Sequence, residues 1–222
     1  MTKSSSRPRL HSPTLDPRLA RNYGEKNSDE VRFTYRDWAD TYDSELLDEF
    51  GYQAPSAAVE TLQKHLPSLG SVILDMGCGT GLVGELLHSL GYRHLDGLDL
   101  SPEMLEKAKA RGVYRTLGEA DLTETLEIEQ IYDAVICVGV FSHQRSQAFD
   151  LVKLFAGLKP NGVLVATVNG KGWRDIGWET LLEQSKREHG FQIEEISDIP
   201  YLTRQDIPGK LLIIRPKLSK SR

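Results

Sequence analysis

A short apolar run that opens into a glycine-rich loop constrains this chain more than any other feature. Residues 72–76 read Val-Ile-Leu-Asp-Met, and Gly77, Gly79, Gly81 and Gly84 follow at the start of an amphipathic pattern. Glycines permit a tight turn and let a ligand approach the backbone, whose free amides face it where the helix begins. A strand, loop and helix in this order predict an adenosyl or dinucleotide site on an α/β domain.

The sequence after this loop alternates short apolar strands with amphipathic helices, which is typical of a parallel sheet with crossover helices. Ser101 and Pro102 are typical of a helix start, and Gly112 is typical of a helix end. The predicted strands are 72–75, 94–99, 113–117, 134–138, 163–168, 191–196 and 211–214, and the predicted helices are 81–90, 102–111, 146–158 and 176–188.

The first third of the chain has a different character. Residues 1–32 are rich in Ser, Pro, Arg and Asn, which predicts a flexible tail, and residues 217–222 form a second polar tail. Two helical patterns fill residues 33–69 and predict a helical cap. We therefore expect a single domain over 33–222, with its α/β core at 70–216.

Composition limits the partners that the chain can have. The formal net charge of −5 argues against a general affinity for nucleic acid or for an anionic membrane. Cys78 and Cys137 are too few for a disulfide framework, and no apolar run reaches the ~18 residues of a bilayer span. The N-terminal residues also lack the apolar segment of a secretory signal. We expect a cytoplasmic protein without a membrane or nucleic-acid partner, and a monomer is favoured over an oligomer.

The glycine pattern by itself leaves the cofactor open. Gly79, Gly81 and Gly84 satisfy the dinucleotide fingerprint, and Asp99 follows Gly81 by eighteen residues at the end of a predicted strand. A nicotinamide or flavin cofactor and an adenosyl ligand without phosphates are both compatible with this spacing.

Charge separates these alternatives. Asp75 directly precedes the loop, where a dinucleotide would place its pyrophosphate, and two like charges ~4 Å apart at an effective dielectric of ~20 repel by roughly 4 kcal/mol. S-adenosylmethionine carries a sulfonium and an ammonium instead. Asp75, Asp99 and Asp121 end three successive predicted strands, which favours a cationic, hydroxyl-rich ligand without phosphate.

Four segments resemble motifs of the class I S-adenosylmethionine-dependent methyltransferases. Residues 72–81 resemble their motif I, 97–105 their second motif, 132–137 their fourth, and 158–164 the segment that enters strand five. The resemblance implies a Rossmann-like, doubly wound seven-stranded sheet of order 3-2-1-4-5-7-6 with strand seven antiparallel. The segment from 35 to 55 further resembles the entry helix of the small methyltransferase-like proteins named after the Williams–Beuren syndrome region.

The resemblance also implies a set of cofactor contacts. Asp99 would hold the ribose, Ala120 and Asp121 the adenine end, and the backbone near Val138 the ammonium. The full set of expected cofactor-binding residues is Tyr35, Tyr42, Asp75, Gly77, Cys78, Gly79, Gly81, Leu82, Asp99, Leu100, Met104, Ala120, Asp121, Leu122 and Val138.

The sequence indicates the methyl-acceptor site less clearly than the cofactor site. His143 follows the fourth predicted strand and has the pKa range of a general base, although a loop histidine that caps the next helix fits the same pattern. Trp38 shares a helix face with Tyr35 and Tyr42, and either lines the site or packs the helix on the core. We expect an acceptor site formed by Trp38, Phe141, His143 and Trp173. No metal site is expected, because the histidines are scattered and no CxxC pair occurs.

The sequence thus predicts a methyltransferase that moves a methyl group from S-adenosylmethionine to a small molecule by direct displacement and releases S-adenosylhomocysteine. One alternative is a non-catalytic S-adenosylmethionine-binding or interaction protein. Another is a nicotinamide-dependent oxidoreductase, which Asp75 and the missing second domain disfavour.

Overall fold

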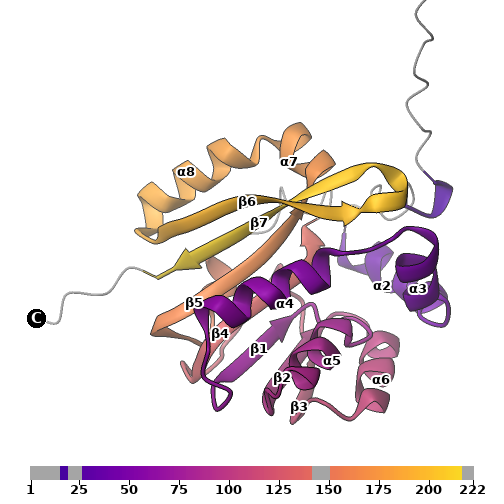
Figure 1. The fold of residues 1–222 in the computed structure, drawn as a ribbon, viewed down its shortest axis with the longest axis horizontal. Coiled ribbons are helices and arrows are strands. Elements are labelled where there is room, and N and C mark those ends of the chain that lie inside the picture. The colour runs from indigo at the N-terminus through magenta and orange to yellow at the C-terminus, as the bar shows by residue number, and fades with distance from the viewer. Residues whose placement is uncertain (1–15, 20–26, 142–150, 217–222) are drawn as a thin grey trace, which may run out of the picture.

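The computed structural model describes residues 16–19, 27–141 and 151–216. Within them a seven-stranded sheet has the order β3-β2-β1-β4-β5-β7-β6 (Figure 1). Pairing from β3 to β5 is parallel, and β7 runs antiparallel between β5 and β6. The predicted fold class and strand order are therefore confirmed.

Five of the seven strands are longer than predicted, whereas β2 has its predicted bounds and β3 is shorter and begins three residues later. Their bounds are β1 Val72–Met76, β2 His94–Asp99, β3 Thr116–Glu119, β4 Tyr132–Phe141, β5 Leu158–Asn169, β6 Gln192–Leu202 and β7 Ile207–Arg215. The α-helices are α2 Ser28–Trp38, α3 Tyr42–Ser44, α4 Ala54–His65, α5 Leu82–Ser89, α6 Pro102–Arg111, α7 Gly170–Ile176 and α8 Trp178–His189. A π-helical turn, η1, covers Glu45–Glu49, and 3₁₀ turns cover η3 Leu151–Phe155 and η4 Thr203–Gln205.

Helix caps explain where several helices begin and end. The helix α6 has the predicted bounds, because the Ser101 hydroxyl accepts a hydrogen bond from the Met104 amide at 3.3 Å and Gly112 ends it with φ +66°. The helix α2 begins at Ser28, five residues before the expected start of the cap. Its earlier start follows from Asn27, whose side chain accepts the Glu30 amide at 2.9 Å.

Two predicted helices differ from the structure. The predicted helix 176–188 corresponds to α8, which starts at Trp178 because Gly177 has φ +74° and ends the preceding helix α7, which was not predicted. The predicted helix 146–158 falls partly outside the described residues. Its described part is the 3₁₀ turn η3, and β5 begins at Leu158, five residues before the predicted strand.

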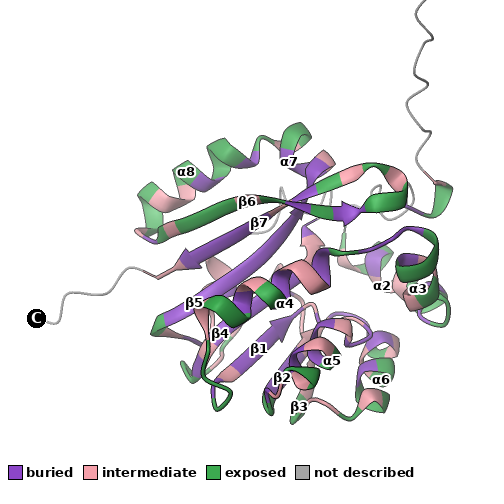
Figure 2. Ribbon diagram, in the orientation of Figure 1, coloured by how far each residue is buried: buried purple, intermediate pink, exposed green. Residues whose placement is uncertain are grey.

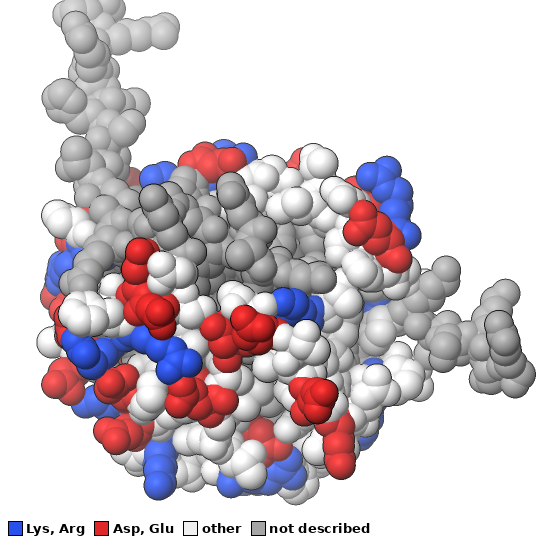
Figure 3. Space-filling view, turned by 180° about the vertical axis from the view of Figure 1, so that it is seen from behind, with Lys and Arg blue, Asp and Glu red and all other residues white. Residues whose placement is uncertain are grey.

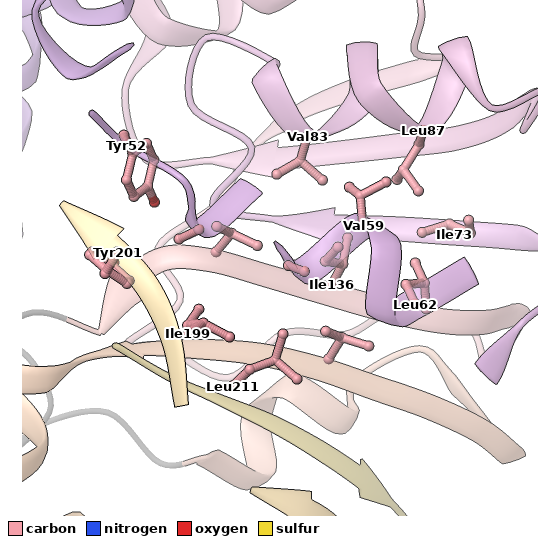
Figure 4. Close-up of a cluster of buried hydrophobic side chains, with 14 of the residues drawn as sticks. Tyr52, Val59, Leu62, Ile73, Val83, Leu87, Ile136, Ile199, Tyr201 and Leu211 are labelled. Carbon is pink, nitrogen blue, oxygen red and sulfur yellow. The ribbon is translucent and has the colours of Figure 1, made fainter. Parts of the chain in front are cut away.

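Alternation along the strands gives the sheet two buried faces. Ile73 and Ile136 pack with α4 and α5 on one face, where Val59, Leu62, Val83 and Leu87 meet them (Figure 4). Leu74 and Val135 point to the other face and pack with residues of η3, α7 and α8. The central strands are buried on both sides, whereas the outer faces of the helices are exposed (Figure 2).

In the described ranges, no helix has the length and apolar character that crossing a membrane requires.

The first face of the core depends on α4, which carries Leu62 into it. Leu62 is fully buried. We expect Leu62→Ala to lower the free energy of unfolding by about 2–5 kcal/mol, because it removes buried methyl groups and leaves a cavity. The exposed Leu181 of α8 provides the control, and Leu181→Ala should change stability by less than about 0.5 kcal/mol. Urea denaturation measures both, and equal losses in the two variants would contradict this packing.

Candidate cofactor site

A pocket lies at the carboxyl ends of β1, β2 and β4, with residues of α2 and α3 also lining it. Its empty volume is about 710 Å³, part of it open to solvent. Its lining residues are Val31, Tyr35, Tyr42, Gly77, Gly79, Asp99, Leu100, Met104, Leu122, Thr123, Val138, Gly139, Val140 and Phe141. Nine of the expected cofactor residues are among them, together with the expected acceptor residue Phe141.

The glycine loop is tied to the end of β2 by backbone hydrogen bonds. The amides of Gly77 and Cys78 both donate to the Leu98 carbonyl, at 2.7 and 3.0 Å. Gly77 has φ +76°, and a Cβ there would lie 2.2 Å from a methyl group of Val140, so no other residue fits. Gly79 has φ +54° and faces open space, where a Cβ would meet no atom within 4 Å.

Asp99 is the carboxylate that lines the pocket. It is half-buried, and its two oxygens accept the amides of Gly79 at 2.8 Å and Ser101 at 2.9 Å. These bonds hold both the carboxylate and the loop in place. A carboxylate accepts more than two hydrogen bonds, so Asp99 can also accept from a pair of ligand hydroxyls.

Asp75 lies behind the loop and is not among the pocket-lining residues. It is buried, and its Oδ2 accepts a hydrogen bond from the Tyr114 hydroxyl at 2.7 Å. Its Oδ1 has no partner among the described residues. Burial raises the pKa of Asp75 to about 7, and the charge of Asp99 adds to this shift. Asp75 is therefore partly protonated at neutral pH. Its buried position behind the loop does not support the expectation that its negative charge faces the ligand.

The last glycine of the fingerprint, Gly84, has a packing role. A Cβ on Gly84 would lie 2.3 Å from the Tyr114 hydroxyl, and the Gly84 amide donates to that hydroxyl at 3.1 Å. Tyr114 thus links the first turn of α5 to Asp75. The match of Gly84 to a dinucleotide fingerprint needs no dinucleotide to explain it.

After β3, Thr123 lines the pocket, whereas the expected residue Asp121 does not. Asp121 accepts hydrogen bonds from the amide of Thr123 at 2.9 Å and from its hydroxyl at 2.7 Å. This local turn leaves Thr123 and Leu122 lining the pocket, whereas Ala120 and Asp121 lie beside it. Cys78, Gly81 and Leu82 also lie outside the lining.

Three aromatic rings of the cap pack together over the pocket. Tyr35 and Tyr42 line it, and burial raises the pKa of the Tyr42 phenol well above its usual value. Trp38 is buried beside both rings, with centroids 6.4 Å from Tyr35 and 4.9 Å from Tyr42, and its indole donates to Glu45 at 2.9 Å. Trp38 therefore holds the two tyrosines in place and does not line the pocket itself.

The expected acceptor residues separate in the structure. Phe141 lines the pocket, whereas Trp173 is buried in α7, stacks on Trp178 at 6.3 Å and lines a second hollow beside Lys210. His143 lies outside the described residues. Sequence reasoning missed Val31, Thr123, Gly139 and Val140; the positions of Gly139 and Val140, directly after a predicted strand, were the available signal.

The pocket suits an adenosyl ligand without phosphates. Gly79 leaves an open space that a Cβ would occupy, and the Asp99 carboxylate can accept hydrogen bonds from ligand hydroxyls. Leu100, Met104 and Leu122 form an apolar wall. No lysine or arginine lines the pocket among the described residues, so a pyrophosphate would meet no cationic partner there. The same part of the chain holds no cluster of three or more His, Cys, Asp or Glu residues arranged for a metal.

The position of Asp75 makes stability depend on pH. Its pKa is raised in the folded state, so its contribution to stability is full below the unfolded pKa near 4 and is lost as the pH rises toward 7. Between pH 5 and 7.5 the free energy of unfolding of the ligand-free protein should fall by roughly 2 kcal/mol relative to Asp75→Asn. Urea titrations at several pH values measure this difference, and parallel pH profiles for the two proteins would contradict it.

Comparison with known proteins finds similarity to methyltransferases. Residues 73–162 match a sequence family described as "Methyltransferase domain". Human Methyltransferase-like protein 27 is 37% identical over 140 residues, which are 60% of this chain and 55% of that protein. The ubiquinone biosynthesis O-methyltransferase of Xylella fastidiosa strain 9a5c is 29% identical over 165 residues, 68% of this chain and 63% of that protein. The chain thus spans between half and two thirds of the length of these two relatives.

A solved structure extends the likeness to the fold. Magnesium protoporphyrin IX methyltransferase from Synechocystis, determined with bound S-adenosylhomocysteine, matches with a TM-score of 0.56 and 20% sequence identity, covering 90% of this chain and 93% of that one. The family match, the relatives and the strand order agree with the motifs in the sequence. Residues 73–162 thus match a methyltransferase domain, and the chain has the strand order and the motifs that are typical of class I S-adenosylmethionine-dependent methyltransferases.

Proposed function

We propose that this protein transfers a methyl group from S-adenosylmethionine to a small-molecule acceptor. The observation that carries the proposal is the pocket itself, where the glycine loop, the anchored Asp99 carboxylate and an apolar wall meet at one edge of the sheet. S-adenosylmethionine carries its methyl group on a sulfonium. The nucleophile of the acceptor attacks the methyl carbon, the carbon–sulfur bond breaks, and S-adenosylhomocysteine leaves.

Each part of the pocket has a proposed task. Asp99 accepts the ribose hydroxyls, and the apolar wall that includes Met104 and Leu122 flanks the adenine. The backbone near Val138 binds the ammonium group. The rings of Tyr35 and Tyr42 shield the sulfonium from water, and their faces attract it. This arrangement orients the methyl donor, and orientation is the main demand of a displacement reaction.

The acceptor is proposed to enter beside the end of β4. Gly139, Val140 and Phe141 line the pocket there, and His143 follows two residues after Phe141. A general base such as His143 is needed where the acceptor is protonated at the working pH. The apolar lining and modest volume support a small acceptor, as does the similarity to relatives whose names give small-molecule substrates.

The surface supports a small molecule over nucleic acid. On the face in Figure 3, Lys and Arg side chains are interspersed with Asp and Glu, without a broad basic area. A nucleic-acid substrate needs such an area to neutralise phosphates.

Calorimetric titration tests the cofactor. We expect S-adenosylhomocysteine to bind with a micromolar-range Kd, about 10⁻⁶ M, and NADH to give no heat of binding, because the described lining has no cationic group for a pyrophosphate. Transfer of labelled methyl from S-adenosylmethionine into a metabolite extract then tests catalysis. Binding without any labelled product would favour a non-catalytic binding protein, and NADH binding alone would point to an oxidoreductase.

The cap tyrosines give a second test. We expect Tyr35→Ala to weaken S-adenosylhomocysteine binding by about fivefold to tenfold, because it removes a ring that lines the pocket. Phe33 lies on the same helix with 53% of its surface exposed, so Phe33→Ala serves as the matched control and should bind normally. Both variants should keep the stability of the wild type within about 1 kcal/mol. Unchanged affinity in Tyr35→Ala would remove the tyrosine from the site.

A further inference from the structure

Asp43 of the cap touches the glycine loop directly. The Thr80 hydroxyl donates a hydrogen bond to Asp43 Oδ1 at 2.5 Å, although the two residues lie 37 positions apart in the chain. Thr80 is the residue between Gly79 and Gly81, and it is buried, with 2% of its surface exposed. A buried hydroxyl needs a hydrogen-bond partner, and the cap supplies it.

Arg111 closes the same cluster from α6. Its guanidinium pairs with Asp43 and with Glu85 of α5, and its Nε donates to the Thr80 carbonyl at 2.6 Å. Asp43 and Arg111 thus hold both the side chain and the backbone of Thr80. The cluster joins the cap, the loop and two helices of the core.

This cluster differs from the other ion pairs between the cap and the core. Asp40 pairs with Lys107 at 2.6 Å, but the side chain of Asp40 is 87% exposed and Lys107 lies on α6, outside the loop. Arg32 pairs with Glu119 at a similarly exposed site. Exposed pairs contribute little, because water and salt screen them. The side chain of Arg111 is 18% exposed and that of Asp43 35%, so water and salt screen this pair less.

The cluster fixes two walls of the pocket relative to each other. Asp43 follows Tyr42, which lines the pocket from the cap, and Thr80 follows Gly79, which lines it from the loop. A bond between Asp43 and Thr80 therefore sets the separation between the tyrosine and the glycine cradle.

We propose that Asp43 is a positioning residue for the cofactor, which holds Tyr42 over the glycine loop through Thr80 and Arg111. The inference rests on the proposed function, since the pocket is taken to bind S-adenosylmethionine. Asp43 itself touches no reacting atom. It holds the cap and the loop in place in the ligand-free protein, so cofactor binding does not carry the free-energy cost of ordering them.

Two variants remove the link from opposite sides. Asp43→Asn keeps the shape but loses the charge that pairs with Arg111, and Thr80→Val keeps the volume but loses the hydroxyl. Both should weaken S-adenosylhomocysteine binding in calorimetry by about tenfold or more, because each breaks a hydrogen bond to a charged group. Thr80→Ser retains the hydroxyl and should bind like the wild type. Asp40→Asn is the matched control for loss of a cap charge and should change the Kd less than about twofold.

Hydrogen exchange of the ligand-free protein separates this inference from the proposed function. Asp43→Asn and Thr80→Val should both speed amide exchange in residues 41–50, whereas Thr80→Ser and Asp40→Asn should not. Wild-type affinity in Thr80→Val, or exchange equal to that of the wild type in both link variants, would overturn the positioning role. Failure of the wild type to bind S-adenosylhomocysteine, with the exchange pattern intact, would instead count against the proposed cofactor.

Discussion

The hydrogen bonds between the glycine loop and the end of β2 are the constraint on which the site depends. The amides of Gly77 and Cys78 donate to the Leu98 carbonyl, and the next amide, of Gly79, donates to the Asp99 carboxylate. The parallel pairing of β1 with β2 brings these groups together, with Met76 opposite Leu98. The loop therefore has its shape before any ligand arrives, and Asp99 is both an anchor for the loop and the acceptor proposed for the ribose.

The cap supplies the second half of the pocket by a different kind of contact. Trp38 packs the two lining tyrosines by its rings, and Asp43 links the cap to Thr80 by a hydrogen bond. Apolar packing holds the cap to the core, whereas the polar link sets its position over the loop. The cap and the glycine loop, whose linked residues Asp43 and Thr80 lie 37 positions apart, thus form two walls of the pocket.

Much of the fold followed from the sequence, because its signals are local. The apolar strands, the Ser101 cap and the glycine at 112 specify elements within a few residues, and the motifs implied the strand order. The short helix α7 was not predicted because its first turn contains Gly170 and Gly172, and glycine disfavours a helix. The early start of β5 was missed because residues 159–162 are polar and include a proline and a glycine, although the strand runs through them.

The site was harder to predict where its lining depends on the direction of a side chain or on contacts between residues far apart in the chain. Asp75 shares its side of β1 with Ile73, so strand alternation turns it toward the core and leaves Asp99 to face the pocket. Thr123 replaces Asp121 because a local turn uses the Asp121 carboxylate. The contact of Asp43 with Thr80 and Arg111 spans long separations in the chain, and no local pattern signals it.

A crystal structure of the protein with S-adenosylhomocysteine tests the central claim most directly, because it locates the ligand relative to Asp99. The account predicts the ribose hydroxyls about 3 Å from the Asp99 carboxylate oxygens, with the sulfur between the glycine loop and the rings of Tyr35 and Tyr42. Density for the ligand elsewhere, or a ribose that makes no hydrogen bond to Asp99, would contradict it.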